Sequence, residues 1–406
     1  MAGCRFQPTD IMAISSDHTS VLRGLKVLDF TAMIAGPYCT RWLADLGAEV
    51  IKVEPPEGDH MRHRSPLRGD RSAYFGHLNA GKKCIALDLK MSSAVAIAQQ
   101  LAKQSDLVVE AFRPGVMERS GLRTDTLRSA NPRLIYCSIS GFGQNSELSQ
   151  RSTYAPVVHA SSGFDWAQGQ DEHGRPLGSN IPMADFLTAM FAFMALQNAL
   201  MVRGTTDSGT FIDVNLMDSL MNFMPYEFQA AKLAAQQPRP RYKPLKARDG
   251  YVLVTPINAR NFRHLCDALG HPEWMQDPML STDAARFANW AEYMRRIEAW
   301  TSERTAAECE TVLTQFDVPC ARYRHIGDSM KDEQFDQRDS FASICDGPQT
   351  YWAAKLPFSF EGLRPSPGHH VSAHGSETAA VLIERLNLSQ HELQALRREG
   401  SIICQP

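Results

Sequence analysis

Short apolar runs alternate with amphipathic segments over the first 140 residues of the chain. The runs at 25–30, 48–54, 84–87, 107–110 and 134–139 predict buried strands, and the stretches at 35–46, 92–103 and 124–129 predict helices. Glycine and proline punctuate the pattern, as in Ala35-Gly36-Pro37 and at Gly47. Strands that alternate with helices indicate a doubly wound α/β fold built on a largely parallel sheet.

A long apolar segment follows, from Phe186 to Val202, and Asp185 stands directly before it. The pattern predicts a helix with Asp185 as its N-cap, where the positive end of the helix dipole favours an ionised carboxylate. On this local pattern alone, Asp185 is a helix cap and nothing more. The same segment is a candidate membrane span, but Thr188 and Gln197 interrupt it and it is short, so a buried core helix is expected.

The second half of the chain predicts a separate small unit. A strand at 211–216 and a helix at 218–235 precede a Pro-rich, basic linker at 236–244. A strand at 251–255 and helices at 261–269, 288–302 and 306–315 then form the small unit, and the tail carries a strand at 358–360 and helices at 377–386 and 389–399. The predicted division is an overhang at 1–21, a large domain at 22–225, the linker and small α+β domain at 226–335, and a return to the large domain at 336–406.

Composition narrows the class of protein. The 406 residues are 43% hydrophobic and 21% charged, with a net charge of −3, which favours a folded chain and argues against a general nucleic-acid binder. The nine cysteines are scattered without a Cys-x-x-Cys pair, which indicates reduced thiols and no metal site. Residues 1–22 lack the apolar core of a signal peptide, so we expect a cytoplasmic protein, or one of the mitochondrial matrix in a eukaryote.

Two loops carry candidate binding chemistry. The segment from Pro55 to Ser72 is rich in arginine and histidine, including Arg62 and Arg64, and is either a solvated surface loop or a lid that collects a carboxylate or phosphate. Gly141 and Gly143 follow the strand at 134–139, where glycine lets backbone amides approach a ligand closely. A Gly-x-Gly-x-x-Gly fingerprint is missing from the first strand–helix turn, so a dinucleotide site is not expected.

Several motifs together resemble one family, in order and spacing from residue 22 nearly to the end. They are Gly24-Leu-Lys-Val-Leu-Asp-Phe30 with Ala35-Gly-Pro37, Gly47-Ala-Glu-Val-Ile-Lys-Val-Glu54, Leu78-Asn-Ala-Gly-Lys-Lys83 with Ile85-Ala-Leu-Asp-Leu-Lys90, Val109-Glu-Ala-Phe-Arg-Pro-Gly115, Asn131-Pro-Arg-Leu-Ile135, Ser140-Gly-Phe-Gly143 and Phe316-Asp-Val-Pro319. The chain resembles the class III CoA-transferases, the family of formyl-CoA transferase, carnitine CoA-transferase and BaiF-like proteins, which also includes α-methylacyl-CoA racemase. The resemblance implies a Rossmann-like large domain built from both chain ends, an inserted small domain, and a homodimer of two interlocked rings.

The resemblance also implies roles for individual residues. The family's nucleophilic aspartate follows a glycine at a helix start, and Asp185 matches it with Ala184 in place of the glycine. The CoA contacts of the family match Ile34, Ala35, Leu87, Asp88, Leu89, Lys90, Ala111, Phe112, Arg113 and Arg119. Tyr154, Arg62, Arg64, Gly141 and Gly143 are further candidates for contacts with substrate. CoA and acyl-CoA are substrates in such an enzyme, and no permanently bound cofactor is implied.

The expected activity is transfer of CoA from an acyl-CoA to a carboxylic acid through an aspartyl anhydride and an aspartyl-CoA thioester. The basic loop favours a small dicarboxylic acid. Ile34 stands where formyl-CoA transferase has a glutamine, and the linker lacks that enzyme's glycine-rich loop, so we expect a different pair of acids from formate and oxalate.

Two alternatives stay open. One is an acyl-CoA isomerase or racemase, which in this family uses a His-Asp pair, but Tyr154 and Ala155 occupy that position and neither replaces histidine in proton transfer. His159 lies nearby but is displaced, and is expected to be structural. The other is a non-catalytic CoA-binding subunit that works beside a paralogue.

Overall fold

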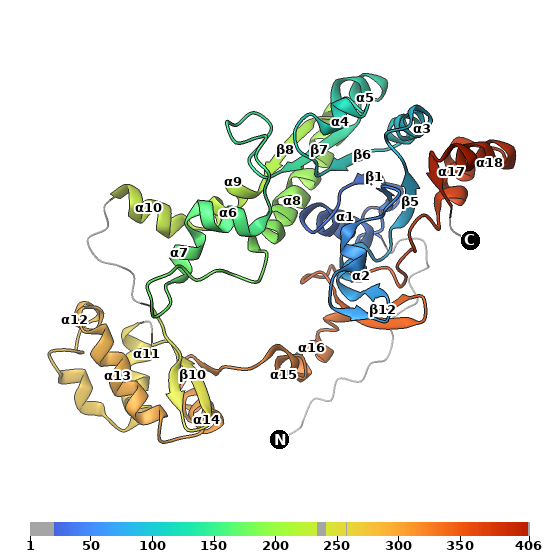
Figure 1. Ribbon diagram of the computed structural model, residues 1–406. Coiled ribbons are helices and arrows are strands. Elements are labelled where there is room, and N and C mark those ends of the chain that lie inside the picture. Colours follow the sequence, from blue (N-terminus) through green and yellow to red (C-terminus); the bar gives the residue numbers. More distant parts are fainter. Residues whose placement is uncertain (1–19, 234–240, 257, 405–406) are drawn as a thin grey trace. The chain divides into compact units, whose positions relative to one another are not determined.

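The computed structural model describes residues 20–233, 241–256 and 258–404 (Figure 1). Its described residues form two compact units, one up to Gln229 and from Asp336 onward, the other over Ala230–Phe335. The predicted breaks lie after residues 225 and 335. The predicted overhang lies outside the described residues except for its last two, and so do residues 236–240 of the predicted linker.

The large unit is built on a seven-stranded sheet in the order β14-β5-β2-β1-β6-β7-β8. Its strands are β1 (Lys26–Phe30), β2 (Glu49–Glu54), β5 (Lys83–Leu87), β6 (Leu107–Glu110), β7 (Ile135–Ser140), β8 (Phe211–Asn215) and β14 (Ile402–Ile403). All pairs are parallel except that of β14 with β5. The chain runs outward from β1 to β2 and β5 and then returns to the other side of β1, so the strand order reverses between β1 and β6. Ligands of open α/β sheets bind at the carboxyl ends of the strands at such a point.

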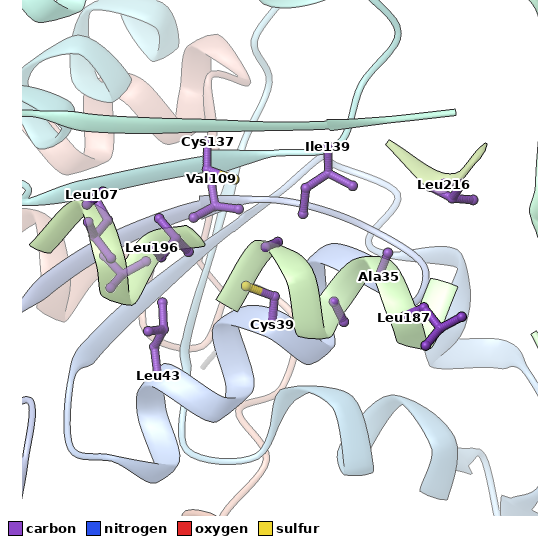
Figure 2. Close-up of a cluster of buried hydrophobic side chains, with 14 of the residues drawn as sticks. Ala35, Cys39, Leu43, Leu107, Val109, Cys137, Ile139, Leu187, Leu196 and Leu216 are labelled. Carbon is purple, nitrogen blue, oxygen red and sulfur yellow. The ribbon is translucent and has the colours of Figure 1, made fainter. Parts of the chain in front are cut away.

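Helices cover both faces of this sheet. The first face carries α1 (Ala35–Asp45), α8 (Met183–Thr206) and α9 (Leu216–Asn222), and the second carries α3 (Ser92–Lys103), α5 (Thr124–Ala130), α17 (Thr378–Leu386) and α18 (Gln390–Glu399). Figure 2 shows the first core, where Cys39 of α1 and Leu196 of α8 meet Val109 of β6. Successive strand residues such as Val108 and Val109 enter opposite cores, which explains the continuous apolar runs in the sequence.

The long helix α8 is buried on one side only. Its alanines, such as Ala189 and Ala192, pack into the first core, whereas Met190, Met194 and Met201 are 50%, 53% and 73% exposed. By length and composition, α8 is the one helix of the described residues that could cross a membrane. The prediction of a buried core helix is therefore right for one face, and the other face of α8 is apolar and exposed.

The C-terminal segment adds a hairpin that the apolar pattern did not predict. β12 (Phe341–Asp346) pairs with β13 (Gln349–Ala354), and the hairpin packs on α2 (Ala73–Asn79). The Tyr351 hydroxyl lies 1.4 Å from where a Cβ on Gly76 would be, so glycine is required there. Arg71 forms an ion pair with Asp346 at 2.6 Å. These contacts tie the returning chain to the N-terminal half.

The small unit has its own core around a three-stranded sheet of β9 (Leu245–Ala247), β10 (Gly250–Val254) and β11 (Cys320–Arg322). Its helices include α11 (Ala259–Leu269), α12 (Asp283–Ala288), α13 (Trp290–Thr301) and α14 (Ala306–Gln315).

Shorter elements of the chain are η1 (His60–His63), β3 (Leu67–Arg68), β4 (Arg71–Ser72), α4 (Val116–Arg119), α6 (Ala155–Ser162), α7 (Phe164–Gln168), η2 (Pro272–Gln276), α15 (Ile326–Ser329) and α16 (Glu333–Gln337).

Two predicted elements were wrong. The helix expected at 218–235 is two helices, α9 and α10 (Pro225–Leu233), because Pro225 lacks an N–H and disfavours the helical conformation at Met224. The strand expected at 358–360 is a single bridge between Phe360 and Leu363.

Candidate active site

A cavity of about 130 Å³ opens at the carboxyl ends of β1, β6 and β7, where the strand order reverses. Loops that follow these strands and the first turn of α8 form its walls. Its lining consists of Ala32, Met33, Ala35, Gly36, Ala111, Phe112, Arg113, Pro114, Ile139, Ser140, Gly141, Ser149, Arg151, Thr153, Tyr154, Asp185 and Leu216. Among these residues, Asp185 is the one with a carboxyl group.

Asp185 is the third residue of α8 and not its N-cap as predicted. The N-cap is Pro182, whose side chain makes no capping hydrogen bond. Burial raises the pKa of Asp185 from 3.8 to about 7. The expected effect of the helix dipole, which favours the ionised carboxylate, is outweighed by desolvation of the charge. A carboxylate of this basicity is poorly solvated and more nucleophilic than one on the surface.

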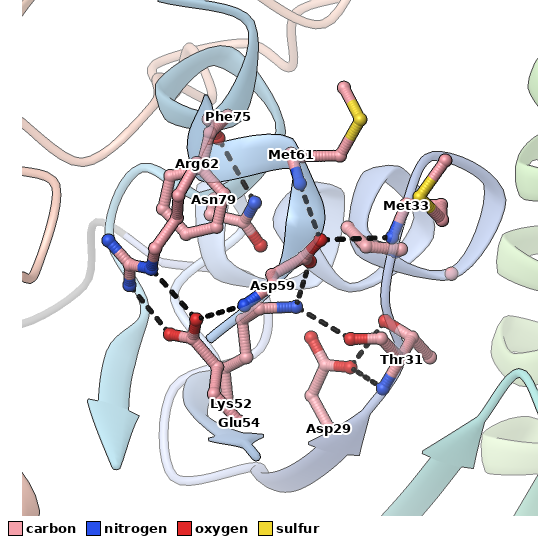
Figure 3. Close-up of polar contacts among 12 residues, drawn as sticks. Asp29, Thr31, Met33, Lys52, Glu54, Asp59, Met61, Arg62, Phe75 and Asn79 are labelled. Atoms are coloured by element: carbon pink, nitrogen blue, oxygen red, sulfur yellow. Dashed lines mark hydrogen bonds and ion pairs between the residues drawn. The ribbon is translucent and has the colours of Figure 1, made fainter. Parts of the chain in front are cut away.

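The turn between β1 and α1 also lines the cavity, and buried charged groups hold this turn in place (Figure 3). Met33 adopts a left-handed conformation with φ of 69°, which costs about 1–3 kcal/mol in a residue other than glycine. Its N–H donates to Asp59 Oδ1 at 3.4 Å, and Asp59 pairs with Lys52 at 3.0 Å. Lys52 also donates to the Thr31 carbonyl at 2.6 Å. The buried Lys52–Asp59 pair therefore holds the turn between β1 and α1 in place.

The start of α1 presents backbone donors to the same cavity. Its N-cap, Ile34, has no side-chain acceptor, and among the described residues none accepts the N–H of Ala35 or Gly36. A Cβ at Gly36 would lie 2.3 Å from Thr31 Cβ, so only glycine fits there. The N-terminal turns of α1 and α8 thus both line the cavity, and each favours negative charge.

The loops that follow β6 and β7 form a basic rim of the cavity, which includes Arg113 and Arg151. Arg113 donates to Ser152 Oγ at 2.8 Å, and the Arg151 guanidinium lies 5.9 Å from the centre of the Phe142 ring. A Cβ at Gly141 would lie 2.0 Å from Thr153 Cγ2, so the loop approaches the rim only with glycine at this position. Guanidinium groups at the rim suit a carboxylate or a phosphate.

The structure brings part of the predicted set together. Ala35, Gly141, Ala111, Phe112, Arg113 and Tyr154 line the cavity with Asp185. Leu87, Asp88, Leu89 and Lys90 lie at the end of β5 and just beyond it, two strands from β1, and Arg119 is exposed at the end of α4. Neighbouring strands lie about 4.8 Å apart, so a ligand that touches both groups must extend roughly 10 Å or more along this edge. Gly143, outside the cavity lining, donates its N–H to Ser140 Oγ, and Ile34 packs partly buried beside the α2 core.

Arg62 has a structural partner in place of the predicted substrate anion. Two of its nitrogens donate to Glu54 at 2.8 and 2.6 Å, and its guanidinium stacks 4.0 Å from the centre of the Phe75 ring (Figure 3). Arg68 donates to the Thr350 carbonyl and Arg71 pairs with Asp346, whereas Arg64 is exposed and outside the cavity lining. Most of the arginines expected to form a lid instead hold the loop against the rest of the unit.

Tyr74 of α2 is a neighbour of Asp185 that the sequence did not predict. Burial, followed by the charge of Asp185, raises the pKa of Tyr74 to about 12, so its hydroxyl keeps its proton. His77, one turn later, has a pKa that burial lowers to about 3, and its ring nitrogen lies 3.3 Å from the Tyr38 hydroxyl. The arginine-rich loop before α2 showed no helical pattern, so nothing in the sequence placed Tyr74 beside Asp185. Ser149 and Arg151 also line the cavity and were not predicted, because they lie in a loop after β7 where the apolar pattern predicts no element.

No cluster of three or more potential metal ligands occurs among the described residues. The described part of the site therefore consists of a carboxyl group, backbone amides and a basic rim.

Comparison with known proteins identifies the family. The family model described as CoA-transferase family III matches residues 22–372. Acetyl-CoA:oxalate CoA-transferase of Acetobacter aceti is 34% identical over 73% of this chain and 79% of its own length. Succinyl-CoA:glutarate CoA-transferase of Mus musculus is 32% identical over 78% and 75%, and formyl-CoA:oxalate CoA-transferase of Escherichia coli O6:H1 is 31% identical over 94% and 99%.

A solved structure extends the match to the fold. The crystal structure of a CAIB/BAIF family protein from Brucella suis is 29% identical, with a TM-score of 0.79 over 90% of this chain and 100% of its own. The family match spans the β1 turn, the β6 and β7 loops and the start of α8, which together build the cavity. The chain belongs to CoA-transferase family III and is an enzyme of the CoA-transferase type.

Proposed function

We propose that this enzyme transfers CoA from an acyl-CoA to a small dicarboxylic acid, with Asp185 as the nucleophile. The observation that carries the proposal is the carboxyl of Asp185 in a cavity formed by two helix N-termini, with its pKa raised to about 7 by burial. The names of three relatives support the substrate class, since they pair an acyl-CoA with oxalate or glutarate. Arg113 and Arg151 at the rim suit the second carboxylate of such an acid or a CoA phosphate.

The reaction proceeds through two acyl exchanges on Asp185. The carboxylate attacks the thioester carbonyl of the donor, which forms a mixed anhydride and releases CoA thiolate. The thiolate attacks the aspartyl carbonyl, which forms an aspartyl-CoA thioester and releases the donor acid. The acceptor carboxylate attacks this thioester, which forms a second anhydride and frees the thiolate again. The thiolate then attacks the acceptor's carbonyl, so that the new acyl-CoA leaves and Asp185 returns to a carboxylate.

Each attack produces an oxyanion that needs hydrogen-bond donors. Ala35, Gly36 and Gly141 line the cavity, and the N–H groups of Ala35 and Gly36 have no acceptor among the described residues. Preorganised backbone amides of this kind commonly contribute about 3–4 kcal/mol to transition-state stabilisation. We assign the α1 turn as the main oxyanion donor because Met33 and Gly36 are conformationally constrained there.

The racemase alternative has less support. Racemisation needs a group that moves a proton at the α-carbon. The Nε2 atom of His159 accepts the backbone N–H of Ala184 and is therefore occupied away from the cavity. Tyr154 lines the cavity, but a phenol does not replace histidine as the group that takes the proton.

We further propose that the enzyme works as a homodimer, in the interlocked form implied by the family resemblance. The exposed methionines of α8 and the exposed Ile181 before it form an apolar surface on a helix that carries the nucleophile. A second copy of the chain would cover such a surface.

The test is a substrate screen with the purified chain and its Asp185→Ala variant. Acetyl-, formyl- and succinyl-CoA serve as donors, oxalate, succinate and glutarate as acceptors, and propionate as a monocarboxylate control. Mass spectrometry of the CoA products should show transfer to at least one dicarboxylate by the wild type and none by the variant. Transfer by Asp185→Ala, or α-deuterium exchange without CoA transfer, would overturn the proposal.

A further inference from the structure

His159 of α6 contacts the backbone of the nucleophile's helix. Its side chain is buried, at 1% exposure, and its Nε2 accepts the N–H of Ala184 at 3.2 Å. Ala184 directly precedes Asp185 and is itself fully buried. The contact spans 25 residues of sequence, so it joins two helices of the large unit.

The first turn of α8 has no cap of its own to replace this bond. The N-cap Pro182 offers no side-chain acceptor. The N–H of Met183 donates to the Ile181 carbonyl at 2.8 Å, and that of Phe186 donates to the Pro182 carbonyl at 3.2 Å. Among the described residues, His159 is the acceptor that satisfies Ala184. Helix starts are ordinarily capped by a neighbour in sequence, so a buried ring on another helix is a distinctive substitute.

The contact also sets the protonation state and the tautomer of the His159 imidazole. A nitrogen that accepts a hydrogen bond carries no proton, so His159 is neutral with its hydrogen on Nδ1. Burial lowers the pKa of His159, while the charge of Asp165 on α7 acts in the opposite direction. The Phe164 ring lies 4.9 Å from the imidazole, and both His159 Nδ1 and Asp165 Oδ1 are buried without a partner in the described part of the chain. Protonation of Nε2 would turn the acceptor into a donor facing another donor.

We propose that His159 is a positioning residue which, as the neutral Nδ1–H tautomer, fixes the first turn of α8 and thereby aims the carboxyl of Asp185 into the cavity. The inference rests on the proposed function of Asp185 as nucleophile. It differs from a role in proton transfer because His159 reaches the backbone and not the reacting atoms. A misplacement of about 1 Å in a reacting group can lower a rate by about 100-fold, so a bond at the adjacent residue is sufficient to control turnover.

The first test compares two substitutions. His159→Gln keeps an acceptor oxygen near the position of Nε2, and His159→Leu removes it while keeping an apolar side chain of similar reach. We expect His159→Leu to lower kcat by about 10- to 100-fold and to change the KM for acyl-CoA by less than about threefold. We expect His159→Gln to retain kcat within about threefold of the wild type. The inference would be overturned if folded His159→Leu had the kcat of the wild type, or if His159→Leu and His159→Gln lost kcat to the same extent.

The second test uses the wild-type enzyme and is independent of how the variants fold. Nitrogen NMR of histidine-labelled protein should show an unprotonated Nε2 at His159 throughout the range from about pH 6 to 8, with assignment by loss of the signal in His159→Gln. A protonated Nε2, or ordinary titration near pH 6.5, would contradict the positioning role. Failure of the proposed function is distinguishable, because then the wild type would show no CoA transfer or the Asp185→Ala variant would retain it.

Discussion

At the scale of single residues, the environment of Asp185 decides how it reacts. The sequence placed a carboxyl at the start of a helix, and the family motif marked it as the nucleophile. The local pattern did not show that this residue lies inside the first turn of α8, nor that burial raises its pKa, because burial depends on parts of the chain that are distant in sequence. Tyr74 illustrates the same limit, because its neighbour Asp185 is brought close only by the fold.

The raised pKa predicts a pH dependence of the first chemical step. If Asp185 is the nucleophile, as we propose, only its ionised form attacks the thioester, and its pKa is about 7. The rate of acyl transfer to the enzyme should therefore rise as pH increases through about 7 and become constant above about 8. Stopped-flow measurement of thiolate release at limiting acyl-CoA tests this. A rate that is already constant from pH 5 upward would contradict it.

The same shift predicts that the Asp185 carboxylate destabilises the fold at neutral and higher pH. The folded pKa of Asp185 lies above its unfolded value of 3.8, so stability is highest below about pH 4 with respect to this group and falls as pH rises to about 7. Asp185→Asn should therefore raise Tm at pH 8 by a few degrees, at about 1 °C per kcal/mol for a chain of 406 residues, and have little effect at pH 4. Calorimetry of both proteins at the two pH values is the measurement. A lower Tm for the variant at pH 8 would contradict the assignment of burial.

At the scale of elements, regular segments were predictable and their tertiary partners were not. The bounds of α3, α14 and β6 follow from apolar periodicity and agree with the predicted ranges. The β12–β13 hairpin was missed because its stability comes from distant contacts, such as that of Tyr351 with Gly76. The turn before α1 was predicted from its glycine, but the buried charges behind it were not. In the sequence Lys52 lies in a predicted strand and Asp59 in a predicted loop, and nothing in that pattern indicates that they pair.

The buried pair behind the first turn predicts a large effect of one substitution. Lys52→Met leaves Asp59 as an unpaired buried charge and frees the Thr31 carbonyl. We expect the free energy of unfolding to fall by about 3–5 kcal/mol, measured by urea titration. Lys83→Met is the matched control, because Lys83 pairs with Glu49 at a partly exposed site and should lose about 0–1 kcal/mol. Similar losses in the two variants would show that the turn does not depend on the buried pair.

At the scale of the whole molecule, the chain consists of a large unit formed from both of its ends and a small unit inserted between them. Alternating strands and helices predicted the first, and the change of pattern after residue 244 predicted the second. What the pattern could not show is the surface of α8, because an apolar helix in sequence does not reveal which face is covered.

That surface predicts the oligomeric state. Met190 and Met194 lie on the exposed face of α8, and a second copy of the chain should bury them. Light scattering coupled to gel filtration should give twice the monomer mass of 45.2 kDa for the wild type and a shift toward monomer for Met194→Glu. A monomeric wild type that is fully active would contradict this, as would recovery of the chain with membranes.

If Asp185 is the nucleophile, an acyl group and then CoA become bonded to it during turnover. Hydroxylamine added during turnover with acyl-CoA should convert the aspartyl thioester to a hydroxamate, and peptide mass spectrometry then locates the modified residue. We expect a hydroxamate on the peptide that contains Asp185, formed only when acyl-CoA is present. Full transferase activity with no adduct at Asp185, or an adduct on a different carboxylate, would contradict it.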